Sequence, residues 1–289
     1  MNRAEILRRI RTIELKTKRF GDTLYTGAYK SKFKGRGMSF SEVRDYQYGD
    51  EIRAIDWNVT ARYDAPYVKV FEEERELSVM ILIDVSASFY YGTHVHSKIE
   101  KAVEFLATIA FSALANNDKT GAIFFTNEVE IYFPPKKGRE HILQMIDHLI
   151  TLKPKQKGTS LGIALKTLRK TQKKKTISFL VSDFRDLDLN PNELYLTRKY
   201  HDLIGVKIND PSEKELRIPA IYQIVNPETG EKQWINGFSN YFKSLFKIDF
   251  DTHHKATVQK LKEKGIPLIE IDSRESVIQP LNSFFKGRK

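Results

Sequence analysis

The 289-residue sequence contains no cysteine, so neither disulfides nor thiolate metal sites can form. No apolar run approaches the roughly 20 residues that a membrane-spanning helix needs. The stretch from Met1 to Phe20 is charged throughout and lacks the apolar core of a signal peptide. We therefore expect a cytoplasmic protein without a transmembrane segment.

Several catalytic motifs are also missing. The sequence has no P-loop, so we expect no ATP hydrolysis by this chain, and it has no Gly-x-Ser-x-Gly elbow. Its seven histidines show no metalloprotease spacing. No zinc finger, basic zipper or RNA-reading aromatic motif accompanies the formal charge of +11, and the basic residues are scattered. We therefore expect no specific nucleic-acid binding, although such a charge attracts anionic partners.

From about residue 77 onward, short apolar runs alternate with segments of helical periodicity. This order is typical of a doubly wound α/β fold, Rossmann-like, with a mainly parallel sheet covered on both faces. We predict one domain over residues 77–289 with an inserted hairpin near 221–236. The predicted strands are Val79–Ile83, Gly121–Thr126, Val129–Phe133 (stopped by Pro134-Pro135), Thr176–Val181, Leu203–Ile208 and Ile266–Ile271, and the predicted helices begin at the Ser97/Glu100 capping box and cover His141–Leu152, Ser160–Lys170 and Thr252–Lys264.

Residues 1–76 form a less regular extension that we expect to pack on the main domain. Ala4 to Phe20 is typical of a basic helix, and Tyr67 to Phe71 predicts a strand. Between them, Gly21 to about Pro66 shows no regular periodicity, although aromatic and charged residues interleave.

A cluster of oxygen donors follows the first predicted strand of the domain. Asp84, Ser86 and Ser88 offer one carboxylate and two hydroxyls from a single loop, which are hard ligands suited to Mg²⁺. Asp183 follows another buried strand, and Thr159 precedes the helix that leads to it. In doubly wound sheets, ligands bind beyond the carboxyl ends of the strands where strand order reverses. If the two strands are neighbours, the five residues form a site for Mg²⁺, or for Mn²⁺ or Ca²⁺.

Each of these residues has an ordinary structural alternative. Asp84 could cap its own turn, Ser86 and Ser88 could satisfy loop amides, and Thr159 could be a helix N-cap. Asp183 could likewise serve turn chemistry. The conjunction of five donors in three loops at one sheet edge favours the metal site.

The pattern Asp84-x-Ser86-x-Ser88, then Thr159, then Asp183 resembles the metal-ion-dependent adhesion site of von Willebrand factor A domains. The preceding segment is similar to the bacterial "domain of unknown function 58" family, on the residues Gly35-Arg36-Gly37, Phe40, Arg44-Asp45-Tyr46, Gly49-Asp50, Arg53, Ile55-Asp56-Trp57 and Ala61-Arg62. The resemblance implies metal contacts through the hydroxyls of Ser86, Ser88 and Thr159, with the aspartates acting directly or through water. A partner's Asp or Glu would fill the open position. It also implies an association with MoxR-type AAA+ ATPases. Phe89-Tyr90-Tyr91 is bulkier than the family pattern at the rim of the site.

The charged residues of the N-terminal segment have two readings. Their arginines and aspartates could form salt bridges that fasten the segment, which we favour, or they could form a docking surface. The candidate residues are Arg36, Arg44, Asp50, Arg53, Asp56, Trp57 and Arg62.

The sequence thus predicts a non-enzymatic, metal-dependent protein-interaction module. The main alternative is a Mg²⁺-dependent phosphohydrolase that uses Asp84 as its nucleophile. Such enzymes carry a second aspartate two residues later, and Ser86 cannot replace its carboxylate in acid catalysis. A basic nucleic-acid-binding protein is a further alternative.

Overall fold

The computed structural model describes residues 8, 10–15, 39–63, 65–72, 77–90, 97–156, 158–185, 190–214, 220–225 and 230–287. Its contacts divide the chain into two units, one of Met1–Thr26 with Leu77–Lys289 and one of Gly27–Glu76. Each unit is described by itself below. The packing of the N-terminal segment on the main domain stays a prediction.

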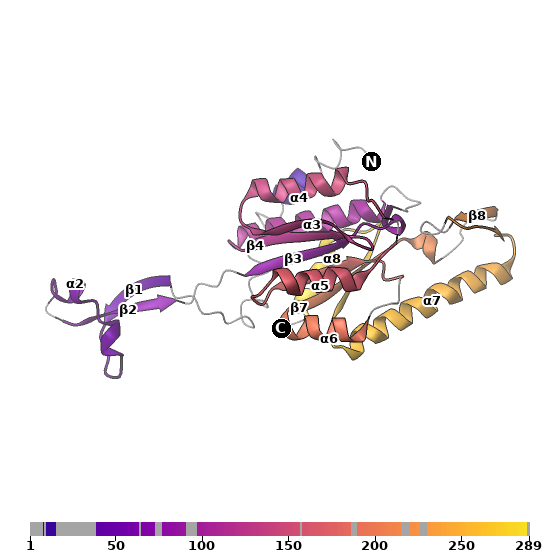
Figure 1. Cartoon of the computed structure of the whole chain (residues 1–289). Helices are drawn as coiled ribbons and strands as arrows, with labels where there is room; N and C mark the ends of the chain where they lie inside the picture. The colour runs from indigo at the N-terminus through magenta and orange to yellow at the C-terminus, as the bar shows by residue number, and fades with distance from the viewer. Residues whose placement is uncertain are drawn as a thin grey trace. The chain divides into compact units, whose positions relative to one another are not determined.

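The larger unit is built on a six-stranded sheet with helices on both faces, which confirms the predicted doubly wound α/β class (Figure 1). The strand order is β10-β7-β6-β3-β4-β5, and every neighbouring pair is parallel except β4 and β5. The strands are β3 (Ser78–Asp84), β4 (Lys119–Phe125), β5 (Val129–Lys136), β6 (Ile177–Ser182), β7 (Asp202–Asn209) and β10 (Leu268–Asp272). The helices are α3 (Lys98–Ala115), α4 (Arg139–Thr151), α5 (Leu161–Thr171), α6 (Pro191–Tyr200), α7 (Asn240–Glu263) and α8 (Ile278–Lys286), with 3-10 turns η2 (Ala87–Tyr90) and η3 (Pro211–Glu213).

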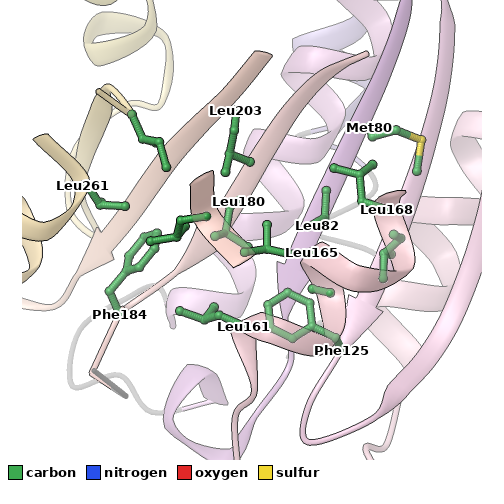
Figure 2. Close-up of a cluster of buried hydrophobic side chains, with 14 residues drawn as sticks. Met80, Leu82, Phe125, Leu161, Leu165, Leu168, Leu180, Phe184, Leu203 and Leu261 are labelled. Atoms are coloured by element: carbon green, nitrogen blue, oxygen red, sulfur yellow. The ribbon is translucent and has the colours of Figure 1, made fainter. Parts of the chain in front are cut away.

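Alternate residues of the buried strands supply two cores, one on each face of the sheet. On one face, Met80 and Leu82 of β3 join leucines of α5, α6 and α7 in a cluster that Figure 2 shows. On the other face, α3 packs on the sheet, where the rings of Phe105 and Phe179 meet edge to face at 5.5 Å. Because each fully buried Leu or Phe stabilises the fold by about 1.5–3 kcal/mol, these clusters hold the central strands rigidly.

Strand order reverses between β3 and β6, which lie side by side in the middle of the sheet. The chain runs outward from β3 through β4 to β5 on one side, and from β6 through β7 to β10 on the other. Asp84 and Asp183 therefore flank the position where doubly wound sheets bind ligands. The predicted site required the strands that precede Asp84 and Asp183 to be neighbours, and the strand order meets this requirement.

Two predicted boundaries and one predicted irregular segment were wrong. β5 does not stop at Pro134 but continues to Lys136, because an edge strand tolerates prolines that a central strand does not. α7 begins at Asn240 rather than at residue 252; its first half exposes Tyr241, Leu245 and Ile248 and so lacks the stripe that indicates a core-facing helix. The segment predicted to be irregular contains a strand, described next.

The smaller unit has a two-stranded antiparallel sheet of β1 (Ser39–Asp45) and β2 (Tyr67–Glu72). Between them lie η1 (Ile52–Ala54) and the single-turn helix α2 (Trp57–Thr60). The side chain of Asp56 caps α2 by accepting from the backbone of Asn58 and Val59. β1 depends on pairing with a strand more than twenty residues away, so its local sequence gives little sign of it.

Two further segments complete the larger unit. Residues 10–15 are helical, with Ile10 and Ile13 buried and Glu14 pairing with Arg139 at 2.7 Å; the rest of the predicted 4–20 helix, except residue 8, lies outside the described residues. β8 (Ile221–Val225) and β9 (Lys232–Asn236) form an antiparallel hairpin. None of the helices that the structure describes is long and apolar enough to cross a membrane.

Candidate metal centre

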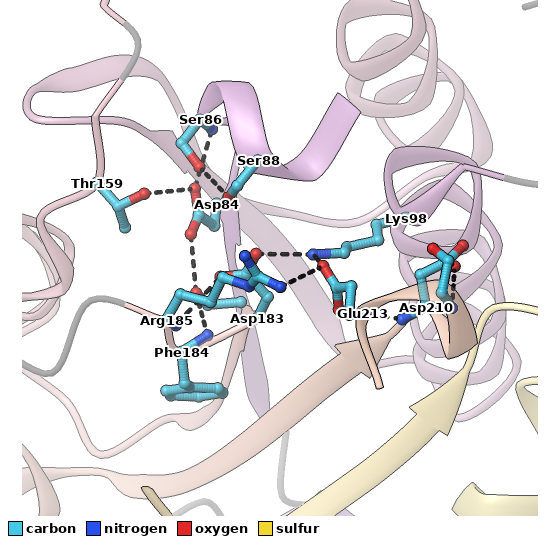
Figure 3. A network of polar contacts seen from close by, with 12 residues as sticks. Asp84, Ser86, Ser88, Lys98, Thr159, Asp183, Phe184, Arg185, Asp210 and Glu213 are labelled. Carbon is cyan, nitrogen blue, oxygen red and sulfur yellow. Dashed lines mark hydrogen bonds and ion pairs between the residues drawn. The ribbon is translucent and has the colours of Figure 1, made fainter. Parts of the chain in front are cut away.

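Asp84, at the carboxyl end of β3, is fully buried and stands at the centre of the candidate site (Figure 3). Its Oδ1 accepts from the backbone N–H of Ser86 at 2.9 Å and from the Thr159 hydroxyl at 3.5 Å. Its Oδ2 accepts from the Ser182 hydroxyl at 2.8 Å. Asp84 therefore also caps its own turn, as the structural alternative proposed, and this bond orients the carboxylate.

Ser86 and Ser88 lie in the loop and the 3-10 turn that follow β3, and both are buried. Their Oγ atoms are 3.1 Å apart, so the two hydroxyls face one another beside Asp84. Phe89 of the same turn is fully buried, whereas Tyr90 is partly exposed and donates to the carbonyl of Leu152. The bulky rim residues thus leave the two hydroxyls beside the carboxylate; Tyr91 lies outside the described residues.

Thr159 reaches the site from the loop before α5. The N-cap position of α5 belongs to Ser160, so the alternative role of Thr159 as an N-cap was wrong. Its hydroxyl donates to Asp84 instead. Gly158 permits this loop path, because a Cβ there would lie 2.7 Å from the side chain of Asn127.

Asp183 follows β6 and is buried, but its side chain has other partners. Its Oδ2 accepts from Lys98 Nζ at 2.8 Å, and its Oδ1 accepts from the backbone N–H of Arg185 at 3.2 Å. Lys98 also pairs with Glu213, which in turn contacts Arg185 at 3.4 Å. The structure therefore brings four of the five predicted residues into direct hydrogen-bond contact, and it places Asp183 beside them in a network with Lys98 (Figure 3).

Three residues of this site were missed by sequence reasoning: Ser182, Lys98 and Glu213. Ser182 had a local signal, because it immediately precedes Asp183 at the end of the strand. Lys98 had a weaker one: it is the first residue of α3, where the helix dipole disfavours a cation. Glu213 had none, since only the fold brings η3 back to the start of α3.

The two buried carboxylates are held in different electrostatic states. Burial, together with the charge of Asp183, raises the pKa of Asp84 to about 7, against the hydrogen bonds from Ser86 and Ser182. Burial also opposes ionisation of Asp183, but the Lys98 ammonium outweighs it and holds the pKa of Asp183 below its ordinary value. Asp84 is the carboxylate that lacks a cationic partner among the described residues.

The donor set fits a hard divalent cation. It consists of three hydroxyls and one carboxylate that no described cation pairs with, and such oxygens suit Mg²⁺, Mn²⁺ or Ca²⁺. Within the described part of the chain, no three His, Cys, Asp or Glu side chains form a cluster that could hold a metal, so a softer ligand set is not present there. A cation beside Asp84 would supply the charge compensation that no described residue provides.

The N-terminal charged residues divide into two groups. Arg44 and Asp50 form a two-pronged salt bridge, with both N···O distances 2.8 Å, and Asp56 caps α2 while lying 3.4 Å from Lys69. These contacts match the structural reading.

The other group is exposed. Trp57 is 66% exposed, and Arg53 and Arg62 are exposed without an ion pair to any described residue. Arg36 lies outside the described residues. A docking role for this group stays a prediction.

A sequence profile described as "Protein of unknown function DUF58" matches residues 42–256. The chain belongs to this family. A DUF58 assignment agrees with the N-terminal residues that suggested it, several of which lie inside the matched span. The match covers residues 42–76 of the smaller unit and the metal-site loops of the larger one.

Known relatives extend the match along the chain. A Mycobacterium tuberculosis protein, "Uncharacterized protein Rv1480", is 27% identical over 286 residues, covering 97% of this chain and 89% of the relative. "Uncharacterized protein YeaD" of Bacillus subtilis is 32% identical over 109 residues, covering 38% of this chain and 25% of that protein. Neither description assigns a catalytic activity.

Solved structures with similarity include a conserved hypothetical protein, BatB, from Bacteroides thetaiotaomicron. It has a TM-score of 0.47 and 13% identity, covering 73% of this chain and 98% of that one. Another is proximal thread matrix protein 1 from the mussel byssus with a zinc-occupied MIDAS motif, at a TM-score of 0.34 and 15% identity over 46% of this chain and 38% of that one.

Proposed function

We propose that this protein is a non-enzymatic interaction module that binds an acidic side chain of a protein partner through a divalent cation, with Mg²⁺ as the expected ion. Asp84, Ser86, Ser88 and Thr159 would hold the cation, and Asp183 would support it from the neighbouring strand. The observation that carries the proposal is that the oxygens of these four residues meet at the switch point of the sheet. They surround a buried carboxylate that has no cationic partner in the described part of the chain.

The charges favour an anionic partner. Lys98 and Arg185 compensate Asp183 and Glu213, so Asp84 is left as one negative charge without a cationic partner among the residues that the structure describes. A divalent ion bound there would leave the site with a net charge of about +1, and a cation of this kind attracts an oxygen anion. An aspartate or glutamate of the partner meets that requirement.

The partner that the family resemblance suggests is a MoxR-type AAA+ ATPase, or an assembly that such an ATPase remodels. The chain lacks a P-loop, so ATP hydrolysis would come from the partner. The exposed Arg53, Trp57 and Arg62 of the smaller unit offer a second contact surface for such a protein.

A pull-down from the organism's own lysate, or with its MoxR-type ATPase, tests the proposal. We expect retention of the partner with Mg²⁺, loss with a chelator, and loss in Ser86→Ala/Ser88→Ala. A matched control is Thr176→Val/Ser178→Ala, which removes another buried hydroxyl pair, 2.8 Å apart, at the other end of the sheet. Binding that persists with chelator and with the Ser86/Ser88 variant would contradict the proposal.

Phosphohydrolase activity is the second candidate, and the geometry disfavours it. Asp84 is fully buried, so it is poorly placed to attack a phosphate. Ser86 supplies no second carboxylate for acid catalysis. Turnover of a model phosphate ester that Asp84→Asn abolishes would favour this candidate instead.

A further inference from the structure

Lys98 is a completely buried lysine at the first position of α3, next to the candidate metal centre. Its Nζ lies 2.8 Å from Asp183 Oδ2 and also pairs with Glu213 Oε1. Glu213 is fixed in turn by accepting from the backbone N–H of Asp210 at 3.3 Å. A buried ammonium with two fixed carboxylate partners is held in place, so its charge is a permanent part of the site.

This placement opposes a divalent ion in two ways. The ammonium occupies one oxygen of Asp183, while the backbone of Arg185 occupies the other. The positive charge of Lys98 also repels the divalent ion, because charges in a buried environment are weakly screened. Glu213 contacts Lys98 and Arg185 but none of Asp84, Ser86, Ser88 and Thr159 among the described contacts, so it influences the centre mainly through Lys98.

We propose that Lys98 is a built-in competitor of the divalent ion: its ammonium holds Asp183 and lowers the affinity of the centre for metal. This inference rests on the proposed function, because it assumes that Asp84, Ser86, Ser88 and Thr159 bind the ion. Lys98 is a positioning residue here, which acts on the ion through Asp183 and through its own charge.

The test is the dissociation constant of Mn²⁺, measured by electron paramagnetic resonance on the metal-stripped full chain and its variants. Lys98→Met should bind Mn²⁺ at least about tenfold more tightly than wild type, which corresponds to about 1.4 kcal/mol. Glu213→Gln should bind it more weakly, because one carboxylate that compensates Lys98 is lost. Lys98→Met/Glu213→Gln should remain tighter than wild type, since the lysine contacts Asp183 directly and the glutamate does not.

The double variant also guards against misfolding, because it removes one positive and one negative charge and leaves fewer unpaired buried groups than Lys98→Met alone. Lys101→Met is the matched control: Lys101 is a buried lysine one turn along α3 that pairs with Glu104 at 2.8 Å and the carbonyl of Glu275. It should leave Mn²⁺ affinity unchanged even if it lowers stability.

The outcomes separate the two proposals. If Asp84→Asn abolishes Mn²⁺ binding but Lys98→Met and the double variant bind no more tightly than wild type, the competitor role is refuted and the metal centre stands. If Asp84→Asn leaves Mn²⁺ affinity unchanged, the metal centre and the competitor role both fail. An equal gain in Lys101→Met would also refute the specific role of Lys98.

Discussion

Replacement of Asp84 by asparagine should stabilise the metal-free protein. The carboxylate is fully buried, has no cationic partner among the described residues and lies near the charge of Asp183. Asparagine keeps the shape: its Oδ1 can accept from Ser86 and Thr159 as the carboxylate does, and its Nδ2 can donate to the Ser182 hydroxyl, which reverses the direction of that bond. The substitution therefore removes a buried charge at little cost in hydrogen bonding.

The size of the effect follows from the pKa of Asp84. Its folded-state pKa of about 7 lies above the ordinary value of 3.8, so the folded state holds the proton more tightly. The neutral carboxyl group of Asp84 is therefore favoured in the folded state, and Asp84 contributes most to stability at low pH. This contribution to stability is lost as pH rises from about 4 through about 7. The rise of the pKa from 3.8 to about 7 corresponds to about 4 kcal/mol at pH 8, and to less than about 2 kcal/mol at pH 5. We expect Asp84→Asn to be more stable than wild type by up to about 4 kcal/mol at pH 8, and by less than about 2 kcal/mol at pH 5.

The assay is urea unfolding of both proteins at pH 8 and pH 5 with a chelator present, repeated at pH 8 with excess Mg²⁺. Mg²⁺ should stabilise wild type and have no effect on Asp84→Asn, because a ligand stabilises only the state that binds it. Asp210→Asn is the matched control: Asp210 is equally buried and caps η3, where asparagine caps about as well as aspartate, so the same substitution should not reproduce the gain of Asp84→Asn. If Asp84→Asn is less stable than wild type at pH 8 without metal, the reasoning about an uncompensated charge is refuted.

Three further predictions follow from individual contacts. Thr159→Val should weaken Mn²⁺ binding at least about tenfold while Ser160→Ala, at the N-cap without a capping bond, leaves it unchanged; equal titration curves for all three proteins would contradict the role of Thr159. His201 is buried, and burial lowers its pKa to about 4, so its contribution to stability is intact above pH 6.5 and is lost as pH falls through about 4. In urea unfolding, wild type should therefore lose up to about 2 kcal/mol more stability than His201→Asn between pH 7.5 and pH 5. Identical losses would show that the histidine does not titrate. Phe125→Ala, in the core cluster on the α5 face, should cost about 3–5 kcal/mol in the same assay, whereas a loss below about 1 kcal/mol would mean that this core is loosely packed.

The regular parts of the fold were predictable because their signals are local. A buried parallel strand is mostly apolar, as β3 and β6 are, and such runs can be recognised in the sequence alone. Two kinds of element could not be predicted in this way: strands that depend on a distant partner strand, and helices whose apolar side chains are exposed. β1 needs β2, and the first half of α7 carries its apolar side chains toward solvent.

The candidate site also has features that were predictable from the sequence and features that depend on the fold. The sequence by itself determined the donor chemistry: hard oxygens at strand ends, without cysteine, and with Ser86 where a phosphohydrolase would carry a second carboxylate. Only the tertiary structure decided that β3 and β6 are neighbours and that Thr159 donates to Asp84. It also placed Lys98 and Glu213 against Asp183. The physical reason is that residue types set which bonds can form, whereas the strand order sets which charges meet in a buried place, where each one strongly affects the others.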